Sequence, residues 1–269
     1  MANFLTLNTH SLMGENIEAK LQSLGEMILK KDCDVVCLQE INQEKDSPVI
    51  GPIDNFCPVP DQFPLHEDNY ALALVRYLKD KGANYYFSYA YNHIGYDHFN
   101  EGVAILAKEP LESQSFVVSK TDDPTDYHTR RILVAKTQIN GQELYAVSAH
   151  FSWLKDGFLA EWQKAVQALA QKHPLVVMGD FNNPAQTKGY QAILDSELGL
   201  QDTYQAARKK SGGPTIEADI DGWEGNSEAL RIDFIFATAE FEPVLSEVVF
   251  DGQTGPVISD HRGVFCQTK

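Results

Sequence analysis

The sequence predicts an α/β fold in which mixed β-sheets are packed as an α/β sandwich. Apolar segments of strand length alternate with amphipathic helical segments along the 269 residues. Hairpin connections occur among the crossovers, so the order differs from the strict alternation of a doubly wound sheet. Because no repeat, low-complexity tract or linker interrupts this pattern, we expect a single domain over residues 1–269.

The first half of the chain begins with a short apolar strand at Phe4–Asn8. A helix is expected at Ile17–Lys30, where apolar residues recur at steps of three and four. A second helix is expected at Asn69–Lys81, ending at Gly82. The strands expected in this half are the apolar Asp34–Glu40, the aromatic-rich Tyr85–Tyr91, and Gly102–Ala107.

The second half contains a predicted hairpin. Asn140-Gly141 is typical of a two-residue turn, and it joins strands expected at Ile132–Ile139 and Leu144–His150. A helix is expected at Phe158–Gln171, where apolar residues form one stripe. The other expected elements are strands at Phe116–Ser119, Leu175–Gly179, Arg231–Thr238, Ser246–Phe250 and Val264–Gln267, and a short helix at Gly189–Leu194.

Two long segments carry no predicted regular structure. Asn42–Asp68 is rich in Pro and Asp, and Ala206–Ala229 is rich in Gly. Segments of this length inside a compact domain often serve a function. A variable surface loop is an equally good interpretation of each.

The net charge of −16 comes from 38 acidic and 22 basic residues. It disfavours nucleic acid and anionic membranes as partners, although a local basic groove or a bound cation can overcome a global charge. We therefore expect neither nucleic acid nor a membrane as a partner. We also expect the protein to be a monomer or a weak oligomer.

The cysteines and the N-terminus indicate a cytoplasmic location. The spacings of Cys33, Cys37, Cys57 and Cys266 match no zinc motif. The first residues lack the charged and apolar regions of a signal peptide, and no segment approaches the length of a membrane span. Free cysteines are typical of the reducing cytoplasm.

Polar residues end or interrupt the apolar strands. Asp233 is the sharpest case, because a carboxylate inside an apolar run is costly to bury unless it is paired. Each such residue alone has an ordinary explanation, but α/β sheets place their sites at the carboxyl ends of strands. The others are Asn8, Glu40, Glu101, His150, Asp180, Asn182, Asp260 and His261.

These residue types predict a metal-assisted phosphoester hydrolase. The carboxylates of Glu40, Asp180 and Asp260 and the amides of Asn8 and Asn182 form a set of hard oxygen ligands. Such a set suits Mg²⁺, or Mn²⁺, better than zinc. A metal that polarises a phosphoryl oxygen, together with two histidines, indicates phosphoester hydrolysis.

Seven segments, in order along nearly the whole chain, resemble motifs of the endonuclease/exonuclease/phosphatase superfamily. They are "LTLNTHS", "CLQEIN", "EGVAILAK", "VSAHFSW", "GDFNNP", "RIDFIF" and "SDHRGV". The resemblance implies a DNase I-like fold, which is a four-layer α/β sandwich with two central mixed β-sheets flanked by helices.

The resemblance also implies roles around a metal. Glu40 would be the main metal ligand, with Asn8 and Asp260 nearby. Asp180 would orient or deprotonate the attacking water, and Asn182 would hold the phosphate.

Two histidine pairs follow from the same resemblance. His261 paired with Asp233, and His150 paired with Glu101, would contact or protonate phosphoryl oxygens. This pairing would give Asp233 a buried partner. Whether Asp180 or His261 is the general base is left open by the sequence.

The substrate indicated is a small phosphorylated sugar such as maltose 6'-phosphate. The segments "LTLNTHS", "NHIGYDHFNEGVAIL" and "DGWEGN" resemble bacterial sugar-phosphate phosphatases of the superfamily. Flat rings at Tyr96, His93 and Trp223, with others at Tyr91 and Trp153, are candidates for packing against a sugar. Each could instead be ordinary core.

The sequence also offers a candidate phosphate-binding arginine and leaves two other functions open. Arg131, next to Arg130, is a candidate phosphate ligand, although either or both could form surface ion pairs. A nuclease would use the same catalytic residues, and a sphingomyelinase-like phosphodiesterase would need an exposed apolar hairpin. The acidic charge disfavours the first, and the lack of a signal peptide disfavours the second.

Overall fold

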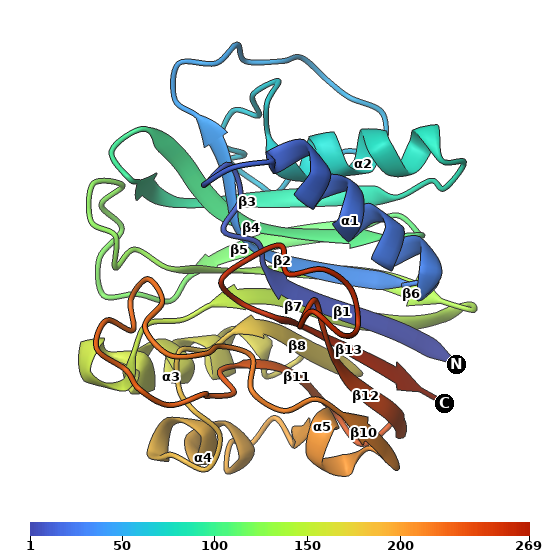
Figure 1. The fold of residues 1–269 in the computed structure, drawn as a ribbon, viewed down its shortest axis with the longest axis vertical. Coiled ribbons are helices and arrows are strands. Elements are labelled where there is room, and N and C mark those ends of the chain that lie inside the picture. Colours follow the sequence, from blue (N-terminus) through green and yellow to red (C-terminus); the bar gives the residue numbers. More distant parts are fainter.

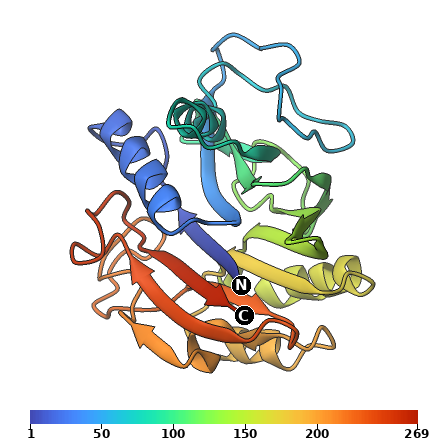
Figure 2. The same ribbon diagram turned by 90° about the vertical axis from the view of Figure 1, so that its right-hand side faces the viewer.

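A computed structural model describes residues 1–269 as two β-sheets packed face to face, each covered by helices on its outer side (Figures 1 and 2). Helices α1 (Ile17–Lys30) and α2 (Tyr70–Asp80) cover one sheet, and α3 (Phe158–Leu169) and α4 (Lys188–Leu194) cover the other. The predicted four-layer α/β sandwich with two mixed sheets is therefore confirmed.

The first sheet has seven strands in the order β10-β12-β13-β1-β2-β4-β3. Its pairs are antiparallel except β1–β2 and β10–β12. Both chain termini lie on this sheet, because β1 pairs with β13 (Figure 2). The strand bounds are β1 Ala2–Asn8, β2 Val35–Glu44, β3 Tyr86–Gly95, β4 Phe99–Ala107, β10 Lys209–Ser211, β12 Pro243–Val249 and β13 Gly263–Thr268.

The second sheet has six strands in the order β5-β6-β7-β8-β11-β9, and only β7–β8 is parallel. Its strands are β5 Glu112–Val117, β6 Arg131–Ile139, β7 Gln142–His150, β8 Leu175–Asp180, β9 Gln201–Asp202 and β11 Asp233–Ala237. A single 3₁₀ turn at Leu154–Asp156 and the one-turn helix α5 (Thr203–Ala206) complete the structure. None of the helices combines the length and apolar character needed to cross a bilayer.

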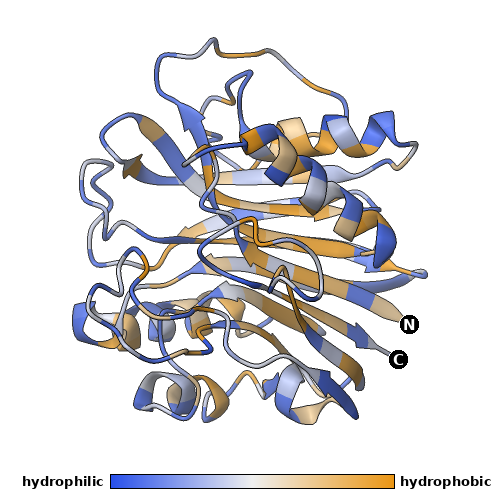
Figure 3. Ribbon diagram, viewed as in Figure 1, coloured by the Kyte–Doolittle hydropathy of each residue, from blue (hydrophilic) through white to orange (hydrophobic).

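Strands at the centre of the sandwich are apolar on both faces. In β8, Val176 and Met178 face the layer between the sheets, whereas Leu175 and Val177 face the layer under α3. Side chains alternate along a strand, so a strand covered on both sides reads as a continuous apolar run. Figure 3 shows this apolar character along the central strands of both sheets.

The predicted β6–β7 hairpin is confirmed. Ile139 pairs with Gln142, and Asn140 and Gly141 have φ values of 53° and 77°. Two consecutive left-handed residues define the type I′ turn that matches the twist of a hairpin.

Several predicted bounds are wrong for one physical reason, which is that polar residues lie inside the hydrogen-bonded ladders. The strand expected at Phe116–Ser119 is β5, Glu112–Val117, a partly exposed edge strand. β3 and β4 extend past their apolar cores to the turn at residues 96–98. Inside the loop expected at Ala206–Ala229, the structure adds the short edge strand β10.

The cysteines behave as small apolar side chains. All four are free, and three of them are buried. Cys37 and Cys266 belong to the layer between the sheets, and Cys33 packs under α1 and α2.

Gly179 allows β8 to approach β7 closely at the end of the strand. A Cβ on this residue would lie 1.9 Å from the carbonyl oxygen of Ala149, and its φ is 147°. Neither the contact nor the backbone conformation tolerates a larger side chain.

We expect Gly179→Ala to lower the free energy of unfolding by at least about 3 kcal/mol, because backbone must move to remove the overlap. Gly199→Ala is the matched control, since Gly199 also has a left-handed φ but open space around it. Gly199→Ala should lower the free energy of unfolding by only about 1 kcal/mol. Urea unfolding of both variants measures the difference, and equal losses would contradict the close approach.

Candidate active site

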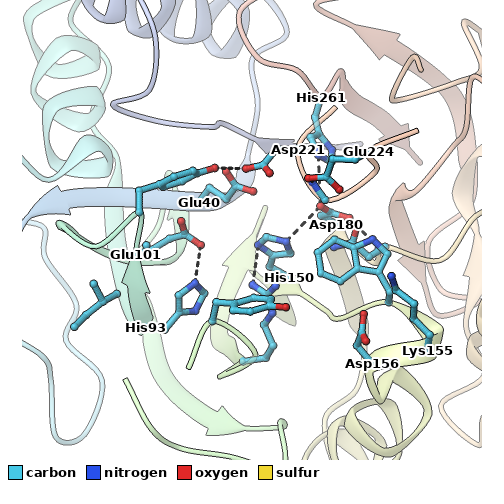
Figure 4. Close-up of a pocket in the computed structure, with 18 residues that line it drawn as sticks. Glu40, His93, Glu101, His150, Lys155, Asp156, Asp180, Asp221, Glu224 and His261 are labelled. Atoms are coloured by element: carbon cyan, nitrogen blue, oxygen red, sulfur yellow. Dashed lines mark hydrogen bonds and ion pairs between the residues drawn. The ribbon is translucent and has the colours of Figure 1, made fainter. Parts of the chain in front are cut away.

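The carboxyl ends of the parallel strands meet at one edge of the sandwich. Register places His150 of β7 and Asp233 of β11 beside Asp180 at the end of β8. A pocket of about 410 Å³ opens there (Figure 4). It is lined by Glu40, His93, Ile94, Gly95, Tyr96, Glu101, Tyr127, Arg130, His150, Trp153, Lys155, Asp156, Asp180, Asn182, Asp221, Gly222, Glu224 and His261.

A β-bulge brings Glu40 into this pocket. β2 does not end at Glu40 as predicted, because it continues to Glu44 after a register shift between Leu38 and Ile41. Glu40 has a φ of 50°, which is uncommon for a residue other than glycine. Bulges re-aim side chains beside active sites, and this one separates Glu40 from the regular alternation of the strand.

Asn8 connects two carboxylates. Its Nδ2 donates to Oε1 of Glu40 at 2.8 Å and to Oδ2 of Asp180 at 3.2 Å. Its Oδ1 accepts from the backbone N–H of His10 at 3.2 Å. In this arrangement Asn8 orients the carboxylates with its amide nitrogen, and the metal-ligand role expected of it stays a prediction.

Asp180 lies at the centre of the site and is almost fully buried. Its Oδ1 accepts from the backbone N–H of Asn182 at 2.9 Å. Its Oδ2 lies 3.5 Å from Nε2 of His150 and 3.7 Å from Nε2 of His261. Burial raises the pKa of Asp180, and the positive charge of His261 opposes that rise.

His261 and Asp233 form the predicted pair. Nδ1 of His261 lies 3.0 Å from Oδ2 and 3.2 Å from Oδ1 of Asp233, which is fully buried in an inner strand. Burial lowers the pKa of His261, but the carboxylates of Asp233 and Asp180 outweigh it and hold the pKa well above its ordinary value. His261 is therefore an imidazolium, and Asp233 fixes its orientation.

The predicted pairing of His150 with Glu101 is wrong. Nδ1 of His150 faces Nη1 of Arg130 at 3.4 Å, and its Nε2 faces Asp180. Burial first, and then the charge of Arg130, lower the pKa of His150 well below its ordinary value. His150 is a neutral imidazole between a cation and a carboxylate.

Glu101 instead pairs with His93 across β3 and β4. Oε1 of Glu101 lies 3.4 Å from Nε2 of His93, and these residues are opposite in the register. A register shift between Tyr91 and His93 sets this pairing, and Gly95 leaves room for it, since a Cβ there would lie 2.7 Å from Oε2 of Glu101. His93 lines the pocket, but its Nε2 is already paired with the carboxylate of Glu101.

Asp260 stands beside Glu40 and is held by His10. Nδ1 of His10 lies 3.0 Å from Oδ1 of Asp260, and Oγ of Ser259 donates to the same oxygen at 3.1 Å. Burial raises the pKa of Asp260, but the hydrogen bond from His10 and the charge of His261 lower it to about 2. Asp260 is therefore an anion.

Arg131 does not reach the pocket, which corrects its predicted phosphate-binding position. Its guanidinium pairs with Asp122 and donates to the carbonyl oxygens of Tyr91 and Asn92 at 3.1 and 3.4 Å. The neighbouring Arg130 lines the pocket instead.

The segment 219–224 forms one wall of the pocket. Asp221 accepts a hydrogen bond from the hydroxyl of Tyr96, in the β3–β4 turn. A Cβ on Gly222 would lie 2.4 Å from the ring of Trp153, which follows β7. Trp223, predicted to contact the sugar, is not among the residues that line the pocket. Its Nε1 donates to Oδ1 of Asn182 at 2.9 Å and so supports that residue.

The donor set near Glu40 fits a divalent cation. Burial first, and then the negative charge of Asp260, raise the pKa of Glu40. Two neighbouring carboxylates that are partly buried repel each other, and a cation between them would relieve that repulsion. Glu40 and Asp260 would hold it, with oxygen ligands that suit Mg²⁺.

Several residues of the site were missed by the sequence analysis. His10 follows the end of β1 by two residues, which is a signal of the same kind as Asn8. Lys155 and Asp156 come from the 3₁₀ turn, and Asp221 and Glu224 come from the segment 219–224; no pattern in the sequence distinguishes them from other exposed charged residues.

We expect the stability of the protein to fall below about pH 6.5 because of His93. Burial, followed by the charge of Arg130, lowers the pKa of His93 to about 4. Between pH 6.5 and 4 the unfolded chain binds a proton that the folded protein does not, so stability decreases as the pH falls, by up to about 3 kcal/mol. His93→Gln removes this contribution. Urea unfolding at pH 4.5, 5.5 and 6.5 measures it, and parallel curves for the two proteins would contradict it.

Comparisons with known proteins agree with this geometry. A sequence model of the Endonuclease/Exonuclease/phosphatase family matches residues 5–261, and no curated protein matches significantly. An endonuclease/exonuclease/phosphatase family protein from Leptotrichia buccalis C-1013-b is 28% identical, with a TM-score of 0.85 over 100% of both chains. A mannosyl-6-phosphatase from Bacteroides thetaiotaomicron VPI-5482 is 17% identical, with a TM-score of 0.71 over 100% of both chains. TDP2 of D. rerio, complexed with a single strand DNA product, is 18% identical, with a TM-score of 0.66 over 100% of this chain and 98% of that one.

Members of this family are typically divalent-metal-dependent, and the structure contains a buried cluster of acidic and histidine side chains. The ligand atoms of Asp180, Asp233 and His261 lie within 4.8 Å of one another, beside Glu40 and Asp260. The family motifs extend across almost the whole chain. The protein therefore belongs to the Endonuclease/Exonuclease/phosphatase family of phosphoester hydrolases.

Proposed function

We propose that the protein is a Mg²⁺-dependent phosphomonoesterase that removes phosphate from a small phosphorylated sugar. The observation that carries this proposal is the chemistry of the pocket mouth, which is lined by carboxylates and aromatic rings. The catalytic residues alone would serve any phosphoester, because phosphoryl transfer depends mainly on positioning and charge neutralisation.

The wall at 219–224 favours a small substrate or the end of a chain. It touches Tyr96, carried by the first sheet, and Trp153, carried by the second, and so it bridges the two sides of the mouth. A continuous polymer needs a groove that is open at both ends, which this wall obstructs.

The charges at the mouth favour a neutral group next to the phosphate. Asp156, Asp221 and Glu224 line it, and Lys155 is the one lysine among the lining residues. Carboxylates repel the phosphates of a nucleic acid but accept hydrogen bonds from sugar hydroxyls. This distribution supports a sugar that carries a single phosphate.

The aromatic side chains supply the complementary surface. Tyr96, Tyr127 and Trp153 line the pocket, and Tyr127 is more than half exposed. Nε1 of Trp153 is buried without a hydrogen-bond partner, so the ring contributes an apolar surface to the pocket. The fold shared with a mannosyl-6-phosphatase is compatible with this substrate class.

The charge states of Asp180 and His261 suggest which residue accepts a proton and which donates one. The bound metal would neutralise charge on a phosphoryl oxygen. Asp180 accepts a proton from water, whose oxygen bonds to phosphorus as the P–O bond to the sugar breaks. The cationic His261, held by Asp233, then gives a proton to the leaving sugar oxygen. In this assignment Asp180 is the base and His261, oriented by Asp233, is the acid, and the products are inorganic phosphate and the free sugar.

The substrate class is tested by phosphate release from a panel that includes maltose 6'-phosphate and mannose 6-phosphate. We expect release in Mg²⁺, its loss in EDTA, and little nicking of supercoiled plasmid or hydrolysis of sphingomyelin liposomes. Asp180→Asn should lower turnover by about 10²–10⁴-fold, as expected for loss of a general base. Plasmid nicking or liposome hydrolysis that exceeds phosphate release would overturn the proposal in favour of a nuclease or a phosphodiesterase.

The pairing of His261 with Asp233 is tested separately. Asp233→Asn keeps the size of the side chain but removes the charge that sustains the imidazolium, so we expect kcat to fall by about 10²–10⁴-fold. Asp195→Asn is the control, because Asp195 caps the end of α4 away from the pocket. Full activity of Asp233→Asn would show that His261 does not need its partner.

A further inference from the structure

Arg130 is a buried cation without an anion. Its side chain lines the pocket, yet the residue is only 3% exposed. Nε is buried with no hydrogen-bond partner, and the single side-chain hydrogen bond is the one that Nη1 donates to Nδ1 of His150. Burying an unpaired charge is strongly unfavourable, so this position implies an anion that binds from the pocket.

The other five arginines each donate to an oxygen atom, which makes Arg130 exceptional. Arg131 and Arg231 pair with Asp122 and Asp202, and Arg208 and Arg262 pair with surface glutamates. Arg76 donates to a backbone carbonyl. The lack of an oxygen partner at Arg130 is therefore not a general feature of arginine in this chain.

The carboxylates near Arg130 are committed elsewhere. Glu101 faces His93, and Glu161 accepts from the backbone N–H and the hydroxyl of Ser152 at 2.9 and 2.8 Å. The backbone of Arg130 is also fixed, since its N–H donates to Oγ of Ser119 at 2.8 Å. The guanidinium is thus bonded to His150 alone and forms no ion pair with a protein carboxylate.

The position of Arg130 relates it to the phosphoryl group. His150 lies between Arg130 and Asp180, with 3.4 Å to the one and 3.5 Å to the other. His261 approaches the same Oδ2 of Asp180 as His150 does. Arg130 therefore adds a second fixed positive charge next to the place where Asp180 and His261 would act.

We propose that Arg130 selects terminal phosphomonoesters over diesters. A monoester dianion carries a third non-bridging oxygen and one more negative charge than a diester, in which an uncharged ester oxygen takes that place. The guanidinium receives this third oxygen and neutralises the extra charge. The proposal rests on the proposed phosphomonoesterase function and gives a reason for it within the site.

The test compares two substrates with the same leaving group, p-nitrophenyl phosphate and methyl p-nitrophenyl phosphate, in Mg²⁺. We expect Arg130→Met to lower kcat/KM for the monoester by about 100-fold and to change that for the diester less than threefold. Arg131→Met is the neighbouring control, and it should keep the ratio of the two substrates found in the unmodified protein. An equal loss for both substrates, or no loss, would overturn the proposal.

Binding and stability supply readouts that do not depend on turnover. In the Asp180→Asn background, calorimetry with inorganic phosphate should show binding weakened at least tenfold by Arg130→Met. Thermal unfolding of Arg130→Met should occur at the same or a higher temperature, because an unpaired buried charge has been removed. A fall in stability with unchanged phosphate binding would identify Arg130 as structural.

The failure of this proposal is distinguishable from the failure of the proposed function. If the unmodified protein prefers the diester, the proposed phosphomonoesterase function and the proposed role of Arg130 are both wrong. If it prefers the monoester and Arg130→Met keeps that preference, only the role of Arg130 falls.

Discussion

Burial of like charges is the constraint on which the rest of the site depends. Glu40, Glu101, Asp180, Asp233 and Asp260 lie together where the ends of two sheets meet. Each has a donor supplied by the fold, either an amide, an imidazole or a backbone N–H. The charge of Glu40 remains under-compensated, because burial and the negative charge of Asp260 raise its pKa and the imidazole of His10 is bonded to Asp260. A divalent ion would supply the missing charge there.

The three histidines of the pocket differ only in their surroundings. His261 contacts two carboxylates and is held as a cation, whereas His150 and His93 are buried near Arg130 and stay neutral. The site therefore has an imidazolium beside Asp180 and a guanidinium on the far side of His150. Between them the neutral imidazole of His150 separates two positive charges, which keeps both fixed without mutual contact.

The sequence predicts most of the fold because the central strands are buried on both faces. Strand ends then locate Asn8, His150 and Asp180, since two pairs of parallel strands lead to one edge, whereas Glu40 lies at a bulge within β2 and Asp233 stands out as a carboxylate in an apolar run. Side-chain partners were not predictable in the same way. They depend on a register shift in β3 and on which of two consecutive arginines faces inward, and a shift of one residue reverses the facing of every side chain.

The shape of the pocket mouth depends on loops as well as on the sheets. The sandwich is shared with solved structures as different as a mannosyl-6-phosphatase and TDP2 complexed with a single strand DNA product, so the fold by itself leaves the substrate open. The wall at 219–224 lies in a segment with little regular structure, and it is held in place by Tyr96, Trp153 and Asn182. Two of these anchors, Tyr96 and Trp153, also line the pocket. Changes at Asp221 or Gly222 would alter the shape of the mouth, whereas Trp223 is linked to Asp180 through Asn182, so the parts of the wall differ in how closely they are tied to the site.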